Sequence, residues 1–282
     1  MPEDIPNVPI DGVAITAIGV AVIRARETNR DDRLYADPLA QAFVDAARTG
    51  FTAERWAHLD ALADRFFDGR TLGVRLVDDR VRDALEAGIA QIVLLGAGLD
   101  TRAFRMGLPP HVAVFEIDLP ELFAFKEAVL NRGTAEPSCQ RHVVAADLRD
   151  DWVTPLHASG FCDDEPTYWV DEGTLGFLTQ EWNQHVVRTL TQLSARGSLF
   201  GAGRFISDPD DTRYRDLRTL VGTDMQTHPG SPVVGADFDV EQWLNDLGWD
   251  TEFRSWNDQI APFGRDVSVA DPRVGNIAAR RR

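Results

Sequence analysis

Short, continuously apolar segments separated by helical patterns occupy the middle of the chain. Five such segments occur, at Gln91–Leu95, Val112–Asp118, His142–Asp147, Thr167–Glu172 and Gly197–Ile206. Apolar residues recur at helical spacing in Leu119–Arg132 and Thr179–Ser194, which lie between these segments. Strands that are apolar on both faces must be covered on both faces. The alternation therefore predicts an α/β fold with a mostly parallel sheet between layers of helices.

The residues before the first strand predict a layer of helices. Four segments carry apolar residues at helical spacing: Ile15–Arg26, a segment beginning at Asp37-Pro38, Thr52–Phe67 and Val74–Gly88. The glycine at the end of the last segment suits a helix C-cap. Residues 1–90 are therefore expected to form a helical cap. The acidic, proline-rich start at residues 1–12 is expected to be a disordered lead. It also lacks the basic start and the apolar core of a signal peptide.

The last third of the chain breaks the regular alternation. Residues 207–237 are rich in Asp, Pro, Gly and Thr and are interpreted as an insertion that forms a lid over the sheet edge. A helix is expected at Asp239–Trp249, with the last strands at Asp250–Trp256 and Arg265–Asp271, and the Arg280–Arg282 end is expected to be solvated. We therefore expect one domain over residues 1–282, with a cap (1–90), a cofactor-binding core (91–206), the lid (207–237) and a C-terminal helix with the last strands (238–282).

Charge and composition argue against several classes of partner. The chain has 282 residues, 45 of them acidic and 29 basic, with a net charge of −16, and this surface repels nucleic acid and anionic lipid. No apolar run approaches the roughly 20 residues that span a bilayer. Only Cys139 and Cys162 are present, and no histidine–cysteine cluster has zinc-ligand spacing. We therefore expect a cytoplasmic protein with no metal, no nucleic-acid partner and no membrane partner.

Glycines and acids follow the first four predicted strands. They are Gly96-Ala97-Gly98 after the first strand, Asp118 at the end of the second, Asp147-Leu148 after the third and Glu172 after the fourth. The carboxyl ends of parallel strands meet at one edge of the sheet, where ligands of such folds bind. Each feature also has an ordinary structural explanation, such as a tight packing turn, a helix N-cap or a salt bridge. Together they predict a ligand site.

The pattern departs from the dinucleotide fingerprint G-x-G-x-x-G. Position 101 is threonine, whereas the third glycine lets a helix and a strand pack closely around a pyrophosphate. Asp118, some 20 residues after the glycines, suits a ribose diol, because a carboxylate accepts hydrogen bonds from adjacent hydroxyls. Asp147 can accept from an adenine amino group beside the apolar Leu148, and Glu172 can accept from an ammonium group. S-adenosylmethionine has these parts, whereas a nicotinamide dehydrogenase is disfavoured by Thr101 and the two extra acids.

These segments resemble the leucine carboxyl methyltransferase family, and more closely its bacterial branch of S-adenosylmethionine-dependent enzymes that act on small molecules. The matching pieces fall in order across residues 16–178: TAIGVAVIRARE, DRLYADPLA, QIVLLGAGLDTRAFRM, VFEIDLPELFAFK, VVAADLRDDW and PTYWVDEGTLGFL. The resemblance implies a class I methyltransferase (Rossmann-like) fold with a helical N-terminal cap.

The resemblance also implies roles for residues at matching positions. Backbone atoms of Gly96, Ala97 and Gly98 would contact the cofactor, Asp118 would hold the ribose, Asp147 and Leu148 the adenine, and Glu172 the amino-acid end. The family holds the methionine carboxylate with an arginine before an acidic pair in the fourth helix. Here Arg75 before Asp78-Asp79 is the first choice, and Arg70 is the alternative because the spacing differs. Phe177 stands where the family often has tyrosine, and Thr174 replaces a usual aliphatic residue.

The chemistry of methyl transfer sets what the acceptor needs. A carboxylate is already ionised at pH 7, whereas a phenol would need a base such as histidine. His185 and His228 are candidates for that base, and the acceptor side has Trp152, Trp169 and Trp182 as candidates for stacking on an aromatic molecule. We expect an O-methyltransferase acting on a carboxylate or hydroxyl of a small, natural-product-like acceptor. The alternatives are an NAD-dependent oxidoreductase and an inactive cofactor-binding homologue, and the oligomeric state stays open.

Overall fold

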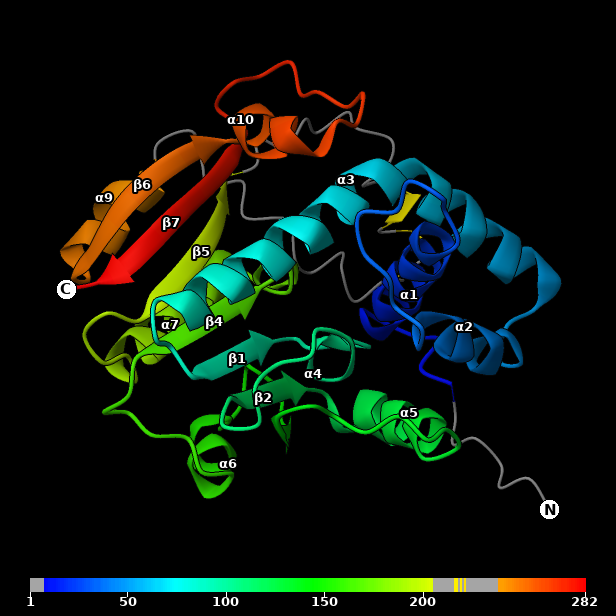
Figure 1. Ribbon diagram of the computed structural model, residues 1–282, viewed down its shortest axis with the longest axis horizontal. Coiled ribbons are helices and arrows are strands. Elements are labelled where there is room, and N and C mark those ends of the chain that lie inside the picture. Colours follow the sequence, from blue (N-terminus) through cyan, green and yellow to red (C-terminus); the bar gives the residue numbers. More distant parts are fainter. Residues whose placement is uncertain (1–7, 205–215, 218, 220, 222–237) are drawn as a thin grey trace.

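A seven-stranded sheet forms the centre of the computed structural model, which describes residues 8–204, 216, 217, 219, 221 and 238–282 (Figure 1). The strand order is β3-β2-β1-β4-β5-β7-β6. The strands are β1 (Gln91–Leu95), β2 (Ala113–Asp118), β3 (Gln140–Ala145), β4 (Thr167–Asp171), β5 (Leu199–Arg204), β6 (Trp249–Ser255) and β7 (Gly275–Arg281). The first five run parallel, and β7 runs antiparallel to both of its neighbours. The expected mostly parallel α/β sheet is confirmed.

The order of the strands reverses direction between β1 and β4. The chain moves from β1 outward through β2 to β3 and then returns to pair β4 with the free side of β1. Gln91 is in register with Ala113 of β2 and with Thr167 of β4, so the carboxyl ends of these three strands lie side by side. A reversal of this kind is where open α/β sheets bind ligands.

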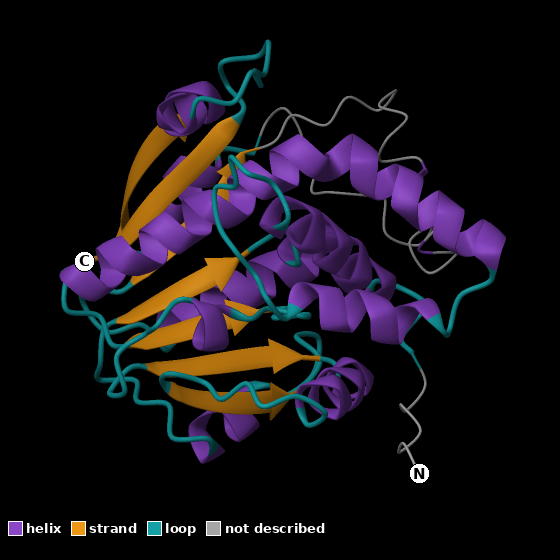
Figure 2. Cartoon of the chain, turned by 45° about the vertical axis from the view of Figure 1, so that its right-hand side comes forward, coloured by secondary structure: helices purple, strands orange, loops and turns teal. Residues whose placement is uncertain are grey.

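Helices cover both faces of the sheet (Figure 2). The helices are α1 (Ala14–Thr28), α2 (Ala40–Arg48), α3 (Ala53–Glu86), α4 (Arg102–Arg105), α5 (Pro120–Leu130), α6 (Val153–Ala158), α7 (Gln180–Gln192), α9 (Val240–Asp246) and α10 (Trp256–Ile260), with 3₁₀ turns η1 (Leu175–Phe177) and η3 (Ala261–Phe263). Val93 and Leu95 of β1 pack in the core formed with α6, α7 and α9, whereas Ile92 and Leu94 pack against the end of α3. Burial on both faces explains the unalternated apolar sequence of this strand.

A helical cap was expected over residues 1–90, where α1, α2 and α3 lie, and we call α1, α2 and the first half of α3 the cap. Ile18, Phe43 and Leu59, one from each of these helices, are 0–2% exposed and share one apolar cluster, which also includes residues of α5. The two segments predicted at Thr52–Phe67 and Val74–Gly88 are a single helix of 34 residues, so their separation was wrong. The glycines between them have helical neighbours on both sides and do not break the helix.

The end of the chain differs from two expectations. Arg265–Asp271 is not a strand, and the last strand is β7, which buries Ile277 and Ala279. Arg265 instead pairs with Glu27 at the cap, 3.0 Å away. Arg281 is the last residue of β7. Its guanidinium is not simply solvated, because it donates to the backbone carbonyl oxygens of residues 247 and 248 at 3.0 and 2.9 Å.

Most of the expected lid at 207–237 lies outside the described residues. Among the few described there, Leu217 and Val221 pack against the apolar cluster of the cap, and Asp216 pairs with Arg65 of α3. No helix in the described part of the chain is long and apolar enough to cross a membrane.

Candidate functional site

The loop after β1 needs its two glycines. Gly96 and Gly98 have φ angles of +65° and +53°, which side chains on L-residues disfavour. A Cβ atom on Gly96 would collide with the side chain of Thr174, and one on Gly98 would lie 3.2 Å from the Cβ atom of Ala17 in α1. The loop is therefore closed in between the turn after β4 and the cap.

Asp118 holds this loop from the end of β2. One carboxylate oxygen accepts a hydrogen bond from the N–H of Gly98 at 2.6 Å, and the other accepts from the N–H of Leu119 at 2.7 Å. Burial raises the pKa of Asp118, although both N–H groups favour its ionised form. Each carboxylate oxygen retains a lone pair, so the group can still accept hydrogen bonds from a ligand.

Asp147 and Leu148 lie at the end of the next strand along the sheet. The N–H of Ala146 donates to the carbonyl oxygen of Asp118 at 2.9 Å, which ties these two strand ends together. The Asp147 carboxylate is 19% exposed and pairs with Arg149 at 2.5 Å, and this hydrogen bond lowers the pKa of Asp147. Leu148 is buried at 6% exposure and belongs to the core. The acid and its apolar neighbour therefore share one end of the site, but the acid already has an arginine partner.

Glu172, after β4, is held by two arginines from different elements. Its carboxylate accepts a hydrogen bond from Arg102 of α4, and its backbone carbonyl oxygen accepts from Arg70 of α3 at 2.7 Å. The Arg102 guanidinium is 3% exposed and also contacts Asp78 at 2.7 Å and Asp100 at 2.5 Å. The side chain of Glu172 remains 27% exposed and so is open to a ligand.

Arg102 and Asp100 were missed as site residues. Both lie within the quoted motif GLDTR, yet the sequence interpretation gave a meaning only to the threonine between them. Burial opposes the charge on Asp100, but the guanidinium groups of Arg102 and Arg24 outweigh that effect and lower the pKa of Asp100.

Of the two arginines considered for the methionine carboxylate, only Arg70 contacts the site. Besides its bond to Glu172, its guanidinium lies 3.6 Å from the position of a Cβ atom on Gly173. Arg75 points elsewhere: it pairs with Asp79 at 3.0 Å and donates to the carbonyl oxygen of Leu34 at 2.9 Å. A five-residue step along a helix turns a side chain by about 140°, which explains why these two arginines face different neighbours.

A second acid, Asp171, shapes the turn after β4. One of its carboxylate oxygens accepts from the N–H groups of Gly173 and Leu175 at 3.2 and 3.1 Å. Burial raises the pKa of Asp171 to about 6. This turn carries Thr174, whose hydroxyl donates to the carbonyl oxygen of Gly96 at 3.4 Å. The threonine that departs from the family pattern is therefore in direct contact with the glycine loop.

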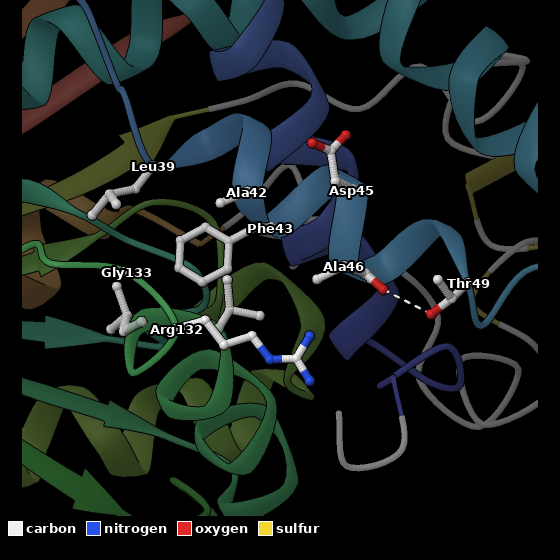
Figure 3. A pocket seen from close by; sticks show the side chains of 10 residues that line it. Leu39, Ala42, Phe43, Asp45, Ala46, Thr49, Arg132 and Gly133 are labelled. Carbon is white, nitrogen blue, oxygen red and sulfur yellow. Dashed lines mark hydrogen bonds between the residues drawn. The ribbon is translucent and has the colours of Figure 1, made fainter. Parts of the chain in front are cut away.

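Other features of the molecule do not contribute to this site. Trp152 and Trp169 are 1% and 0% exposed and pack against each other in the core, so they offer no face to an acceptor. Among the described residues, no group of three or more His, Cys, Asp or Glu side chains is arranged to hold a metal ion. A groove of about 410 Å³ lies between α2, which contributes Phe43, and the end of α5, near Arg132 (Figure 3), and no residue of the candidate site lines it.

The sequence profile of one known family covers more than half of the chain. The profile described as "Leucine carboxyl methyltransferase" matches residues 17–191, which include most of α1, the glycine loop and the acids at the ends of β2, β3 and β4. The chain belongs to the leucine carboxyl methyltransferase family. The resemblance seen in the sequence motifs is thereby confirmed.

Two proteins from other organisms are similar to most of this chain. A protein of Parafrankia sp. (strain EAN1pec) is 43% identical over 250 residues, which are 84% of this chain and 77% of the relative. A protein of Saccharopolyspora erythraea is 37% identical over 278 residues, covering 94% and 93% of the two chains. Both carry the name of S-adenosyl-L-methionine-dependent methyltransferases.

Solved structures support the fold. A DUF574 family protein from Streptomyces avermitilis superposes with a TM-score of 0.56 at 15% identity, covering 93% of this chain and 97% of the other. A structure from Thermobifida fusca that is described as a methyltransferase superposes with a TM-score of 0.55 at 17% identity, covering 96% of this chain and 95% of the other. The fold of this family member is therefore the expected class I methyltransferase fold.

Proposed function

We propose that this protein transfers a methyl group from S-adenosylmethionine to an oxygen atom of a small acceptor molecule, with a carboxylate as the preferred target. Its family and the names of its relatives support the coarser statement, that it is an S-adenosylmethionine-dependent methyltransferase. The observation that carries the assignment of the site is the meeting of the glycine loop, Asp118 and Glu172 at the carboxyl ends of β1, β2 and β4.

The residues at these strand ends fit the nucleoside half of the cofactor. Gly96 and Gly98 have no side chain of their own that would stand between the backbone and a ligand, while Thr174 and Ala17 lie against the same loop. The remaining lone pairs of Asp118 would accept from the ribose hydroxyls, and Asp147 would accept from the adenine amino group beside Leu148. Asp147 is partly exposed and paired with Arg149. To accept from the adenine amino group, the Asp147 carboxylate would have to move away from Arg149 or accept hydrogen bonds from both groups.

The residues beside β4 fit the amino-acid half of the cofactor. Glu172 would accept from the ammonium group, and Arg70, which contacts the same turn, would bind the carboxylate. Arg102 acts behind them, because its buried guanidinium fixes the carboxylates of Glu172 and Asp100. When bound, the cofactor supplies an electrophilic methyl group, and this chain has to hold and align it and exclude water.

Acid–base chemistry favours a carboxylate over a hydroxyl as the acceptor. An ionised carboxylate attacks without losing a proton, so no general base is needed. The charged groups brought together here are acids and arginines, namely Asp100, Asp118, Glu172, Arg70 and Arg102. Of the two histidines considered as bases, His185 packs edge-on against Trp182 at 5.5 Å, and His228 lies outside the described residues. The description of the family also names a carboxyl group.

Transfer of a labelled methyl group tests the proposal. The purified protein, with S-adenosylmethionine labelled in the methyl group, would be given a panel of small carboxylic acids and a matched panel of phenols. A carboxylate target gives a methyl ester, which mild base hydrolyses to volatile labelled methanol. A phenol target gives an aryl methyl ether, which mild base does not cleave. Label that is stable to base would favour the hydroxyl target. Cofactor binding without transfer to any member of either panel, or to an extract of small molecules, would favour the inactive homologue.

A nicotinamide dehydrogenase is the other alternative, and it predicts different binding. Titration calorimetry with S-adenosylmethionine and with NAD separates the two. Tight NAD binding without S-adenosylmethionine binding would overturn the proposed function.

A further inference from the structure

Thr101 occupies the position of the third glycine of the dinucleotide fingerprint, and it has a specific partner. Its hydroxyl donates to a carboxylate oxygen of Asp37 at 2.7 Å. Thr101 is 0% exposed and Asp37 is 1% exposed, and Asp37 lies in the cap, between α1 and α2. A buried side chain from the cap is therefore bonded to the end of the glycine loop.

Arg24 of α1 completes this connection. One nitrogen of its guanidinium lies 3.1 Å from the same oxygen of Asp37, and the other donates to the carbonyl oxygen of Leu99 at 2.5 Å. Arg24 is 3% exposed. The loop is thus held at Leu99 and Thr101 by the cap, while Asp118 holds it at Gly98 from the sheet.

The energetics of buried charges argue against a role in stability alone. A buried ion pair contributes little net stability compared with apolar residues of the same volume, because both charges lose their hydration. Such a pair instead fixes the relative position of the two segments that carry it, because its hydrogen bonds form only at a particular distance and angle. The geometry fixed here is that of the backbone between Gly96 and Thr101. Gly96 and Gly98 in this segment have no side chains of their own that could hold it in place.

We propose that Thr101, Asp37 and Arg24 are positioning residues that hold the glycine loop in the shape that binds the cofactor, so that cofactor binding depends on the helical cap. This inference rests on the proposed function, which places S-adenosylmethionine on that loop. A purely structural connection between cap and sheet would give a different result on mutation. It would lower the stability of the fold but leave the cofactor affinity of the folded protein unchanged.

The test compares Thr101→Val with a matched buried threonine far from the loop. Thr191 of α7 is 6% exposed, donates to the carbonyl oxygen of Val187 at 2.7 Å and accepts from the indole N–H of Trp249 at 2.9 Å. Thr101→Val and Thr191→Val each remove one buried hydroxyl at nearly constant volume. We expect both to lower the thermal unfolding midpoint, but only Thr101→Val to raise the Kd for S-adenosylmethionine, by at least tenfold. Thr101→Ser, which keeps the hydroxyl, should stay within threefold of the wild type.

Two further measurements keep the inference falsifiable. If Thr101→Val does not fold, Asp37→Asn takes its place and is judged by the same comparison with Thr191→Val. Hydrogen exchange of the backbone N–H groups of residues 98–101 should be faster in Thr101→Val than in the wild type without any ligand. A Kd within twofold of the wild type, or unchanged exchange in this loop, would overturn the inference. Failure of the wild type to bind S-adenosylmethionine would instead overturn the proposed function, and the exchange experiment would still show whether the cap holds the loop.

Discussion

The carboxylate of Asp118 accepts a hydrogen bond from the backbone N–H of Gly98 at 2.6 Å and so joins the end of β2 to the glycine loop after β1. The two residues are 20 positions apart in the sequence and become neighbours because β1 and β2 pair in parallel register. The acid therefore has a structural task in the free protein in addition to its proposed contact with ribose. Any test of its role must separate these two tasks.

Asp118→Ala and Glu172→Ala should each weaken binding of S-adenosylmethionine by about 1–3 kcal/mol, because each removes a charged acceptor of hydrogen bonds. Titration calorimetry measures the change. Asp151→Ala is the control, since Asp151 also accepts from a backbone N–H, that of Thr154 at 3.0 Å, but lies outside the candidate site. Unchanged affinity in both site variants, with the fold intact by circular dichroism, would refute the assignment.

Arg70→Ala should weaken cofactor binding about tenfold or more, whereas Arg75→Ala should leave it within twofold. The two residues lie on the same helix, but only the guanidinium of Arg70 contacts the turn at Glu172. Arg75 is half-buried, pairs with Asp79 at i,i+4 and donates to the carbonyl oxygen of Leu34, so its loss should cost about 1–2 kcal/mol of stability without affecting the site. The reverse ranking of the two affinities would show that the sequence pattern was the better guide.

Gly96→Ala should destabilise the fold by about 2–4 kcal/mol, because the new methyl group meets Thr174 in addition to the strain at positive φ. Gly107→Ala provides the matched control. Gly107 has a φ of +62°, close to the +65° of Gly96, but nothing lies within 4 Å of its Cβ position. It should therefore lose only about 1 kcal/mol. Urea denaturation gives both values, and equal losses would mean that Thr174 moves aside freely.

Asp171 should make stability depend on pH in a definite direction. Burial raises its pKa from 3.8 to about 6, so the folded protein holds this proton more tightly than the unfolded chain does. The resulting stabilisation is complete below about pH 4 and is lost as the pH rises through 6, by up to about 3 kcal/mol. Asp171→Asn keeps an oxygen that accepts from Gly173 and Leu175 but cannot ionise.

The free energy of unfolding of wild type relative to Asp171→Asn should therefore fall between pH 4 and pH 7. Urea denaturation of both proteins across this range measures the difference, in which the titration of other groups largely cancels. A difference that stays constant with pH would mean that Asp171 has an ordinary pKa in the folded protein.

The centre of the sheet could be predicted from sequence because β1, β2 and β4 are buried on both faces. β1 was predicted with its observed bounds, and the strand predicted at Thr167–Glu172 starts as expected and ends one residue earlier, at Asp171. The last strands were harder, because β7 ends in two arginines, Arg280 and Arg281, and so resembles a solvated tail. The unbroken α3 was missed since glycine weakens a helix by only about 1 kcal/mol, which packing against the cap and sheet outweighs.

The site could be predicted only where residues sit at strand ends. Asp118 and Glu172 follow from the topology, because parallel strands bring their carboxyl ends to one edge. Arg102 reaches this edge through side-chain packing across α3 and α4, and no spacing rule indicates such a contact. The choice between Arg70 and Arg75 depended on the rotation of α3, which only the packing of that helix determines.

A crystal structure of the protein with S-adenosylhomocysteine tests the central claim most directly. We expect the ribose hydroxyls at the carboxylate of Asp118, the adenine beside Leu148 and the ammonium group at Glu172, with the backbone of Gly96 and Gly98 against the ligand. A ligand bound elsewhere, such as in the groove between α2 and α5, with the end of β1 empty, would contradict the account.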